Sequence, residues 1–302
     1  MAATLATLVT APRPRACVGA KGPDAESYLN RMLSNDLAAV PVQGSCDALL
    51  LTAKARVIAP VRLVRRAVDD FLLLTEPELG TVLRSQLLRA RFAARVEIAE
   101  EQHTVTLVLG EGWAPPAGSI AAACPDYGVP GWEVIDTAAP EGARAAGPDE
   151  LERLRIVART PRFGAEVDDR VMPAEAGLVA ANVDFAKGCY PGQEPIARLH
   201  YRGHANRGLR ALVLDGGAGA GVGAGAGPAA ALPAYDAPVR LDGKEVGRVT
   251  SAVAAGAGDL AVGGRDGAAT GGVLVLAYVR EEVPEDAVLE VAGVPARQLP
   301  RS

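Results

Sequence analysis

Residues 187–194, KGCYPGQE, are the segment of this 302-residue chain that most restricts its fold, because their composition predicts an irregular loop. Two glycines and a proline favour a tight, irregular backbone path, because glycine adopts conformations that side chains forbid. The same eight residues carry a thiol, an ammonium, a phenol, an amide and a carboxylate, a composition typical of a functional site. Lys187, two residues before Cys189, would favour the reactive thiolate of that cysteine. The alternative is a small, buried and unreactive cysteine in a glycine-rich loop.

The other cysteines, at positions 17, 46 and 124, indicate no metal site and no disulfide framework. The sequence has no CxxC motif and no short Cys/His spacing, so neither a zinc site nor a self-contained iron–sulfur site is expected. These three cysteines lie in alanine-rich or strand-like surroundings, which are typical of inert thiols. We therefore expect Cys189 to be the functional thiol.

The charge balance restricts the possible partners. Thirty-one basic and 36 acidic residues give a formal charge of −5, which argues against a strongly basic nucleic-acid-binding surface but leaves room for a local basic patch. The chain has no run of 18 apolar residues, and its first ten residues lack the positive region of a signal peptide. We expect a cytoplasmic protein without a membrane partner.

The apolar spacing predicts an α+β arrangement followed by a small antiparallel barrel. Helices are expected over 24–36, 76–89 and 148–158. Strands are expected over 47–51, 57–64, 71–74, 95–98, 104–109 and 132–135, and the barrel strands over 239–241, 246–254, 273–279 and 288–294.

Chain length favours two or three modules, because single hydrophobic cores stop growing at roughly 250 to 300 residues. We expect an N-terminal α+β module over 1–110, a second α+β module over 111–207 and a C-terminal β-barrel domain over 208–302. The tract 216–234 is almost wholly Gly, Ala and Pro. Such a composition buries too little apolar surface to offset its backbone entropy, so this tract is expected to be a flexible insertion.

The loop and its surroundings resemble the signature of the YgfZ family, folate-binding relatives of the glycine-cleavage T protein. The resemblance rests on KGCYPGQE with RFG at 162–164, PAEAGL at 173–178, IARLHYRGH at 196–204 and DGKEVGRVTS at 242–251. It implies a T-protein-like folate-binding fold of two α/β modules plus a C-terminal antiparallel β-barrel. It also implies tetrahydrofolate or a derivative as the cofactor.

The resemblance also assigns roles to individual residues. Glu175 alone would be taken for a surface glutamate, but in similar proteins the glutamate at this place contacts the pterin ring, whose N–H donors a carboxylate can accept. Arg198 would hold the anionic part of the folate, and Cys189 with Lys187 would carry the chemistry. The cofactor-binding residues implied are Glu175, Arg198, Tyr190, Gly192, Gln193 and Glu194, with the last four shaping the loop. His200 or His204 is a weaker candidate for a base to Cys189.

One departure from T proteins bears on catalysis. Where those enzymes carry an acid/base aspartate, this chain has Ala59 and Pro60. Neither residue can move a proton, so aminomethyl transfer is doubtful and the sequence leaves open whether the protein is an enzyme.

Together these observations predict a folate-binding protein of the YgfZ type that acts in iron–sulfur cluster assembly or repair. Its partners would be iron–sulfur proteins or their assembly machinery. Two alternatives stay open. One is a folate-dependent aminomethyltransferase in which another carboxylate, such as Asp36, replaces the missing aspartate. The other is a folate-dependent tRNA-modification factor that binds RNA near residues 198–210.

Overall fold

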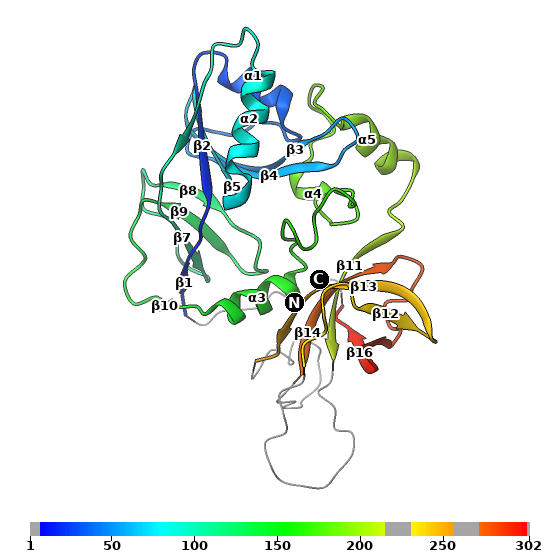
Figure 1. Ribbon diagram of the computed structural model, residues 1–302. Helices are drawn as coiled ribbons and strands as arrows, with labels where there is room; N and C mark the ends of the chain where they lie inside the picture. Colours follow the sequence, from blue (N-terminus) through cyan, green and yellow to red (C-terminus); the bar gives the residue numbers. More distant parts are fainter. Residues whose placement is uncertain (1–6, 215–230, 257–271, 301–302) are drawn as a thin grey trace.

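A computed structural model describes residues 7–214, 231–256 and 272–300, which form two open sheets and a closed barrel (Figure 1). Most of the tract expected to be a flexible insertion, residues 216–230, lies outside the described residues. In the described part of the chain, no helix combines the length and the apolar character needed to cross a membrane.

The first sheet is antiparallel, and two helices cover one of its faces. The run Phe71 to Leu74 shows why both faces are apolar: Phe71 and Leu73 pack under the helices, whereas Leu72 and Leu74 point to the second sheet. The strands, in spatial order, are β3 (Ser45–Leu51), β4 (Val57–Ala67), β5 (Asp70–Thr75), β2 (Ala16–Lys21) and β6 (Glu97–Glu101). The two helices are α1 (Ala25–Met32) and α2 (Gly80–Ala90), and the short 3₁₀ helix η1 (Pro77–Leu79) leads into α2.

The second sheet packs its apolar face against the first through Val105, Ala122 and Ile135. Its strands, in spatial order, are β10 (Arg144–Ala145), β1 (Val9–Pro12), β7 (Val105–Leu109), β9 (Gly131–Ile135) and β8 (Ile120–Ala123). Helix α3 (Pro148–Ala158) begins at a proline, where the missing N–H costs no hydrogen bond. It connects this sheet to the barrel.

The expected antiparallel barrel is confirmed. Its strands, in spatial order, are β11 (Arg207–Leu214), β14 (Val273–Arg280), β13 (Lys244–Ala254), β12 (Pro238–Leu241), β15 (Leu289–Val291) and β16 (Val294–Gln298). The single strand expected over 288–294 is wrong. Ala292 and Gly293 have φ angles of 51° and 79°, so the chain reverses there into a hairpin.

The signature loop lies where the first sheet meets the barrel. Two helices flank it, α4 (Val179–Asn182) and α5 (Gln193–Arg202). Tyr190 and Ile196 share one core with Leu49 of β3, Leu209 of β11 and Tyr278 of β14. This shared core fixes the loop relative to both neighbours. The expected module boundaries at 110/111 and 207/208 stay a prediction.

His103 links the two sheets through both of its ring nitrogens. Nδ1 lies 2.6 Å from Asp136 and Nε2 lies 2.8 Å from Glu101, so only the protonated ring can donate to both. Although partial burial opposes the charge, these carboxylates raise the pKa of His103 above its ordinary value.

We therefore expect the stabilisation from His103 to be present at pH 6 and to fade as the pH rises through the raised pKa. Urea unfolding of wild type and His103→Gln should differ by about 0.5 to 1 kcal/mol more at pH 6 than at pH 9. An equal difference at both pH values would contradict this prediction.

Candidate functional site

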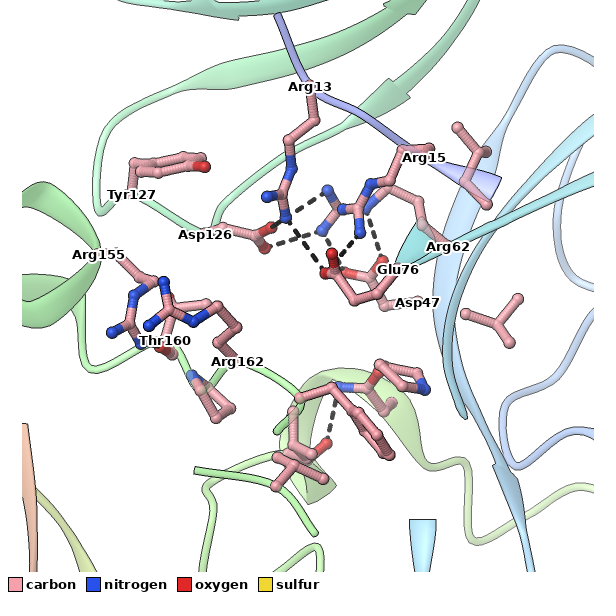
Figure 2. Close-up of a pocket in the computed structure, with 18 residues that line it drawn as sticks. Arg13, Arg15, Asp47, Arg62, Glu76, Asp126, Tyr127, Arg155, Thr160 and Arg162 are labelled. Carbon is pink, nitrogen blue, oxygen red and sulfur yellow. Dashed lines mark hydrogen bonds and ion pairs between the residues drawn. The ribbon is translucent and has the colours of Figure 1, made fainter. Parts of the chain in front are cut away.

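A cluster of buried charges occupies the space between the two sheets (Figure 2). At its centre is Glu133 on β9, whose side chain has no exposed surface. Its carboxylate accepts hydrogen bonds from Arg15 at 2.6 and 3.2 Å, from Arg62 at 2.9 Å and from Arg13 at 3.4 Å. Glu76 accepts a further bond from Arg15 at 2.8 Å.

The arginines determine the ionisation of this cluster. Burial opposes ionisation of Glu133, but the positive charges of Arg15 and Arg62 outweigh it and lower its pKa to about 2. Arg62 also binds Asp47 with bonds of 2.8 and 3.1 Å and Asp126 with one of 2.8 Å. Burial nevertheless raises the pKa of Asp47, whereas Arg62 lowers that of Asp126 despite its burial.

Two adjoining cavities meet at this cluster. A cavity of about 110 Å³ is lined by Arg13, Arg15 and Arg62 among others, and a second of about 460 Å³ is lined by Glu175. Asp47, Asp126, Thr160, Pro161, Leu178 and Asn182 line both. The second volume lies in the usual range for small-molecule sites.

Glu175 stands on the wall of the larger cavity, in a turn within PAEAGL. Its carboxylate accepts the backbone N–H of Met172 at 2.9 Å and two bonds from Arg207, at 2.8 and 3.4 Å. An ionised carboxylate has about four acceptor positions, so at least one is left for a ligand. The small side chains of Ala174 and Ala176 leave space on either side.

Arg198 does not line the cavity beside Glu175. It is exposed on α5 and is absent from the residues that line either cavity, so the guanidinium next to Glu175 is that of Arg207. His200 of the same helix stacks on Phe185, with ring centroids 4.1 Å apart. Its ring therefore serves packing between α5 and the preceding loop.

Lys187 fastens the signature loop to the end of helix α1. Its ammonium donates to the carbonyl oxygens of Asn30 and Asn35 at 2.6 Å and of Leu33 at 2.7 Å, at the end of α1. Burial lowers the pKa of Lys187 to about 8, so the charged form still predominates at pH 7. These bonds use all three donors of the ammonium, which leaves none for the thiol of Cys189.

The rest of the loop is shaped by one tyrosine and one glycine. Tyr190 is buried, with its ring 5.4 Å from the ammonium of Lys187, and burial raises its pKa to about 12. Gly192 has a φ of +83°, and a Cβ there would lie 2.6 Å from the carbonyl oxygen of Thr52. Only glycine fits this position, from which Gln193 and Glu194 begin α5.

Cys189 is exposed, whereas Cys17 and Cys124 are buried and Cys46 is partly buried. Burial raises the pKa of the Cys17 thiol to about 11 and those of Cys46 and Cys124 to about 12. Cys189 is not among the described residues that line the cavity beside Glu175. The sequence assigned the thiol and the Glu175 carboxylate to one site, but of the two only Glu175 is among the described residues that line this cavity.

Of the two positions of the missing aspartate, Pro60 lies beside the charge cluster, whereas Ala59 packs in the core under helices α1 and α2. Ala59 is buried, and Pro60 lines the smaller cavity, where its carbonyl accepts the hydroxyl of Thr75 at 2.7 Å. Asp36 accepts the backbone N–H of Ala38 at 3.1 Å, as a turn-capping aspartate does.

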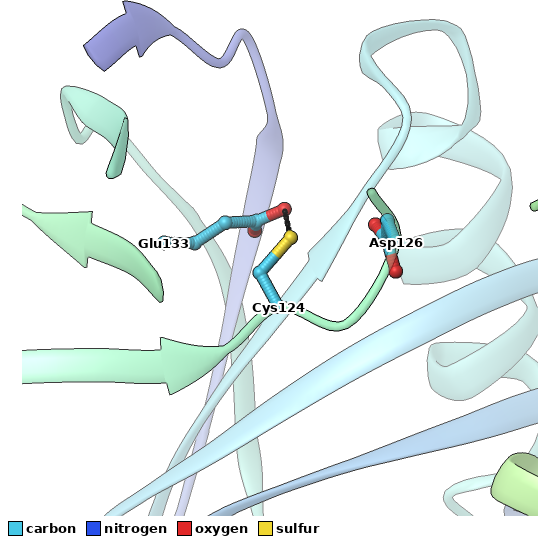
Figure 3. Close-up of side chains that lie close together, drawn as sticks. All are labelled: Cys124, Asp126 and Glu133. Atoms are coloured by element: carbon cyan, nitrogen blue, oxygen red, sulfur yellow. Dashed lines mark hydrogen bonds between the residues drawn. The ribbon is translucent and has the colours of Figure 1, made fainter. Parts of the chain in front are cut away.

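Cys124, Asp126 and Glu133 bring ligand atoms within 4.8 Å of one another (Figure 3). The Cys124 thiol lies 3.9 Å from Glu133 and has a raised pKa. Both carboxylates already pair with arginines. A cation would have to displace these guanidinium groups, so this donor set is poorly suited to a metal.

The sequence reasoning missed the charge cluster. The sequence feature that could have indicated this cluster is a charged residue inside a largely apolar strand, as with Arg62 in β4 and Glu133 in β9. Such residues are rarely buried unless they are paired, so each one indicated a partner elsewhere in the chain.

No family profile matches the chain, but comparison with known proteins finds similar sequences and a similar fold. It is 28% identical over 226 residues to the tRNA-modifying protein YgfZ of Edwardsiella ictaluri, a match that covers 64% of this chain and 66% of that protein. The resemblance to the YgfZ proteins is confirmed. The chain is also 32% identical over 192 residues to an iron–sulfur cluster assembly factor IBA57 homologue of Aspergillus clavatus, covering 60% of this chain and 40% of that protein. The match thus spans less than two thirds of the length of either relative.

The fold has a counterpart among solved structures. The glycine cleavage system aminomethyltransferase T from Bartonella henselae superimposes with a TM-score of 0.75 at 16% identity, covering 98% of this chain and 86% of that one. This confirms the expected T-protein-like fold of α/β modules and a C-terminal barrel. At this identity the likeness concerns the fold alone.

Proposed function

We propose that this chain binds tetrahydrofolate or a derivative in the cavity beside Glu175 and acts in the assembly or repair of iron–sulfur proteins. The observation that carries the folate proposal is the Glu175 carboxylate, held by Arg207 and Met172 on the wall of a 460 Å³ cavity with an acceptor position to spare. When bound, the folate would either supply one-carbon chemistry or act as a regulatory ligand. Glu175 would orient its pterin ring by accepting N–H donors.

Two partly exposed arginines in the smaller cavity could contact an anionic ligand. Arg13 and Arg162 line the smaller cavity with side chains that are 24% and 49% exposed, so both can reach a carboxylate of the folate tail. Arg198 stays a prediction for the same role, at the protein surface.

Truncation of Glu175 should weaken folate binding. Calorimetry with tetrahydrofolate should show an affinity about 30-fold lower for Glu175→Ala, because a charged hydrogen bond of about 2 kcal/mol is lost. Glu282→Ala, which removes a carboxylate that is 74% exposed, is the matched control and should bind as wild type does. Equal affinity of Glu175→Ala and wild type would remove this residue from the site, and no binding by wild type would refute the ligand.

The iron–sulfur part of the proposal rests on Cys189 and on the relative named as a cluster assembly factor. An exposed thiol is available to a partner's cluster, whereas thiols with raised pKa react slowly. Alkylation of the native protein should therefore label Cys189 before Cys17, Cys46 and Cys124.

In cells that lack the protein, Cys189→Ser should fail to restore the activity of iron–sulfur enzymes while it still binds folate. Cys46→Ser is the control and should restore that activity. If Cys189→Ser restores it fully, the thiol has no part in cluster maintenance.

Participation in tRNA modification is the second candidate function. It is favoured by relatives 26% to 28% identical that are named as tRNA-modifying proteins. Nucleoside analysis of tRNA from cells that lack the protein would test it, with unchanged modification as the contrary result. Aminomethyl transfer has less support, because Ala59 and Pro60 offer no proton-transfer group.

A further inference from the structure

A groove of about 620 Å³ lies beside the helices of the first sheet, apart from the cavities described above. It runs between the end of α1 and the turn that follows α2, two helices that lie side by side over the first sheet (Figure 1). Its walls include Tyr28, Arg31, Arg91 and Phe92. None of these residues lines the cavities beside Glu175 or the charge cluster.

Phe92 is held in a conformation that its residue type does not favour. Its φ is +45°, in a turn closed by the backbone bond from Ala94 to Arg91 at 2.9 Å. Glycine, asparagine or aspartate normally fills such a position, because a Cβ is strained there. The side chain is 93% exposed, so it gains no burial in return. Neither packing nor backbone preference accounts for a phenylalanine here, and strain of this kind is typical of binding sites.

Positive charge gathers around this ring. Arg31 and Arg91, which line the groove with Phe92, are exposed, and in the described part of the chain no carboxylate forms an ion pair with either. Arg95 differs, because it is paired with Asp24 at 3.1 Å. The favourable interaction of an arginine with the helix dipole accounts for Arg31 in the last turn of α1, but not for its place with Arg91 in the groove of an exposed ring. The patch is cationic on a chain whose net charge is −5.

We propose that this groove binds a single-stranded segment of RNA, with a base stacked on Phe92 and phosphates bound by Arg31 and Arg91. Proteins that bind single-stranded nucleic acids combine exposed aromatic rings, on which bases stack, with cationic groups, which bind the phosphates. Acidic peptides would use the arginines and leave the ring without a role. The choice of RNA rests on the second candidate function, whereas the groove itself is independent of the folate site.

Fluorescence anisotropy with a labelled 12-nucleotide oligouridylate, at several salt concentrations, tests the proposal on the full chain. Phe92→Asn removes the ring but suits the backbone, and it should bind about tenfold more weakly without a loss of melting temperature. Arg91→Gln should lower the slope of log K against log salt by about 0.7. Arg280→Gln, an exposed arginine on the barrel, is the matched control and should leave affinity and slope unchanged.

Three results would overturn the proposal: unchanged binding by Phe92→Asn, an equal loss in Arg280→Gln, or tighter binding of oligothymidylate or polyglutamate than of oligouridylate. Nucleoside analysis of tRNA separates this proposal from the function on which it rests. Altered tRNA modification in cells that lack the protein, with no RNA bound by the groove, would refute only the groove.

Discussion

Replacement of Glu133 by alanine should cost about 3 to 5 kcal/mol of unfolding free energy, the range found when one partner of a buried ion pair is removed. Glu133 is fully buried and pairs with Arg13, Arg15 and Arg62, so its loss leaves guanidinium groups without their central partner. Urea unfolding at pH 7 measures the effect. Asp47→Asn is the control and should cost less, because Arg62 keeps Glu133 and Asp126.

The same residue predicts how the protein unfolds in acid. The folded-state pKa of Glu133 is about 2, below its ordinary value of 4.5. A carboxyl with a depressed pKa stabilises the folded state above the ordinary value, and this contribution is lost as the pH falls through the folded-state pKa. Wild type should therefore lose stability between about pH 4 and pH 2, and Glu133→Gln should lack this component. A loss below 1 kcal/mol in Glu133→Ala at pH 7 would show that the cluster does not depend on its central carboxylate.

Replacement of Lys187 by methionine should cost about 3 kcal/mol, because three charge-assisted hydrogen bonds to the end of α1 are lost together. Methionine has a similar length and keeps the apolar part of the packing. Urea unfolding should show the loss. Lys54→Met, which changes an exposed lysine, is the control and should leave stability within about 0.5 kcal/mol.

This variant also distinguishes two roles for Lys187. If the lysine fastens the loop, Lys187→Met should lower stability while Cys189 is alkylated at least as fast as in wild type, since the loosened loop exposes the thiol further. If Lys187 activates the thiol, the variant should keep the unfolding free energy of wild type, and alkylation of Cys189 should be slower. The three carbonyl contacts favour the first role.

Several helices and strands could be predicted from the sequence because the spacing of their apolar residues is a local property of the chain. Helix α3 spans 148–158 as expected, and β3, β4 and β5 lie where apolar runs predict strands. The expected helix over 24–36 ends earlier, at Met32. Helix α5 escaped notice because Pro195 suggests a loop, but a proline in the first turn interrupts no helical hydrogen bond. Strand β2, with its alanines and a glycine, has too little apolar pattern to be recognised.

Sequence alone determined the features that depend on neighbouring residues: the tight backbone path of the glycine-rich signature loop, the apolar faces of the sheets, and the resemblance carried by that loop. Tertiary structure decided every pairing between distant side chains. Arg207, 32 residues from Glu175, holds that carboxylate, and Lys187 reaches carbonyls more than 150 residues away. The physical reason is that charge pairing depends on distance in space, which spacing along the chain does not encode. For the same reason, Cys189 and Glu175, only 14 residues apart, do not share a cavity wall.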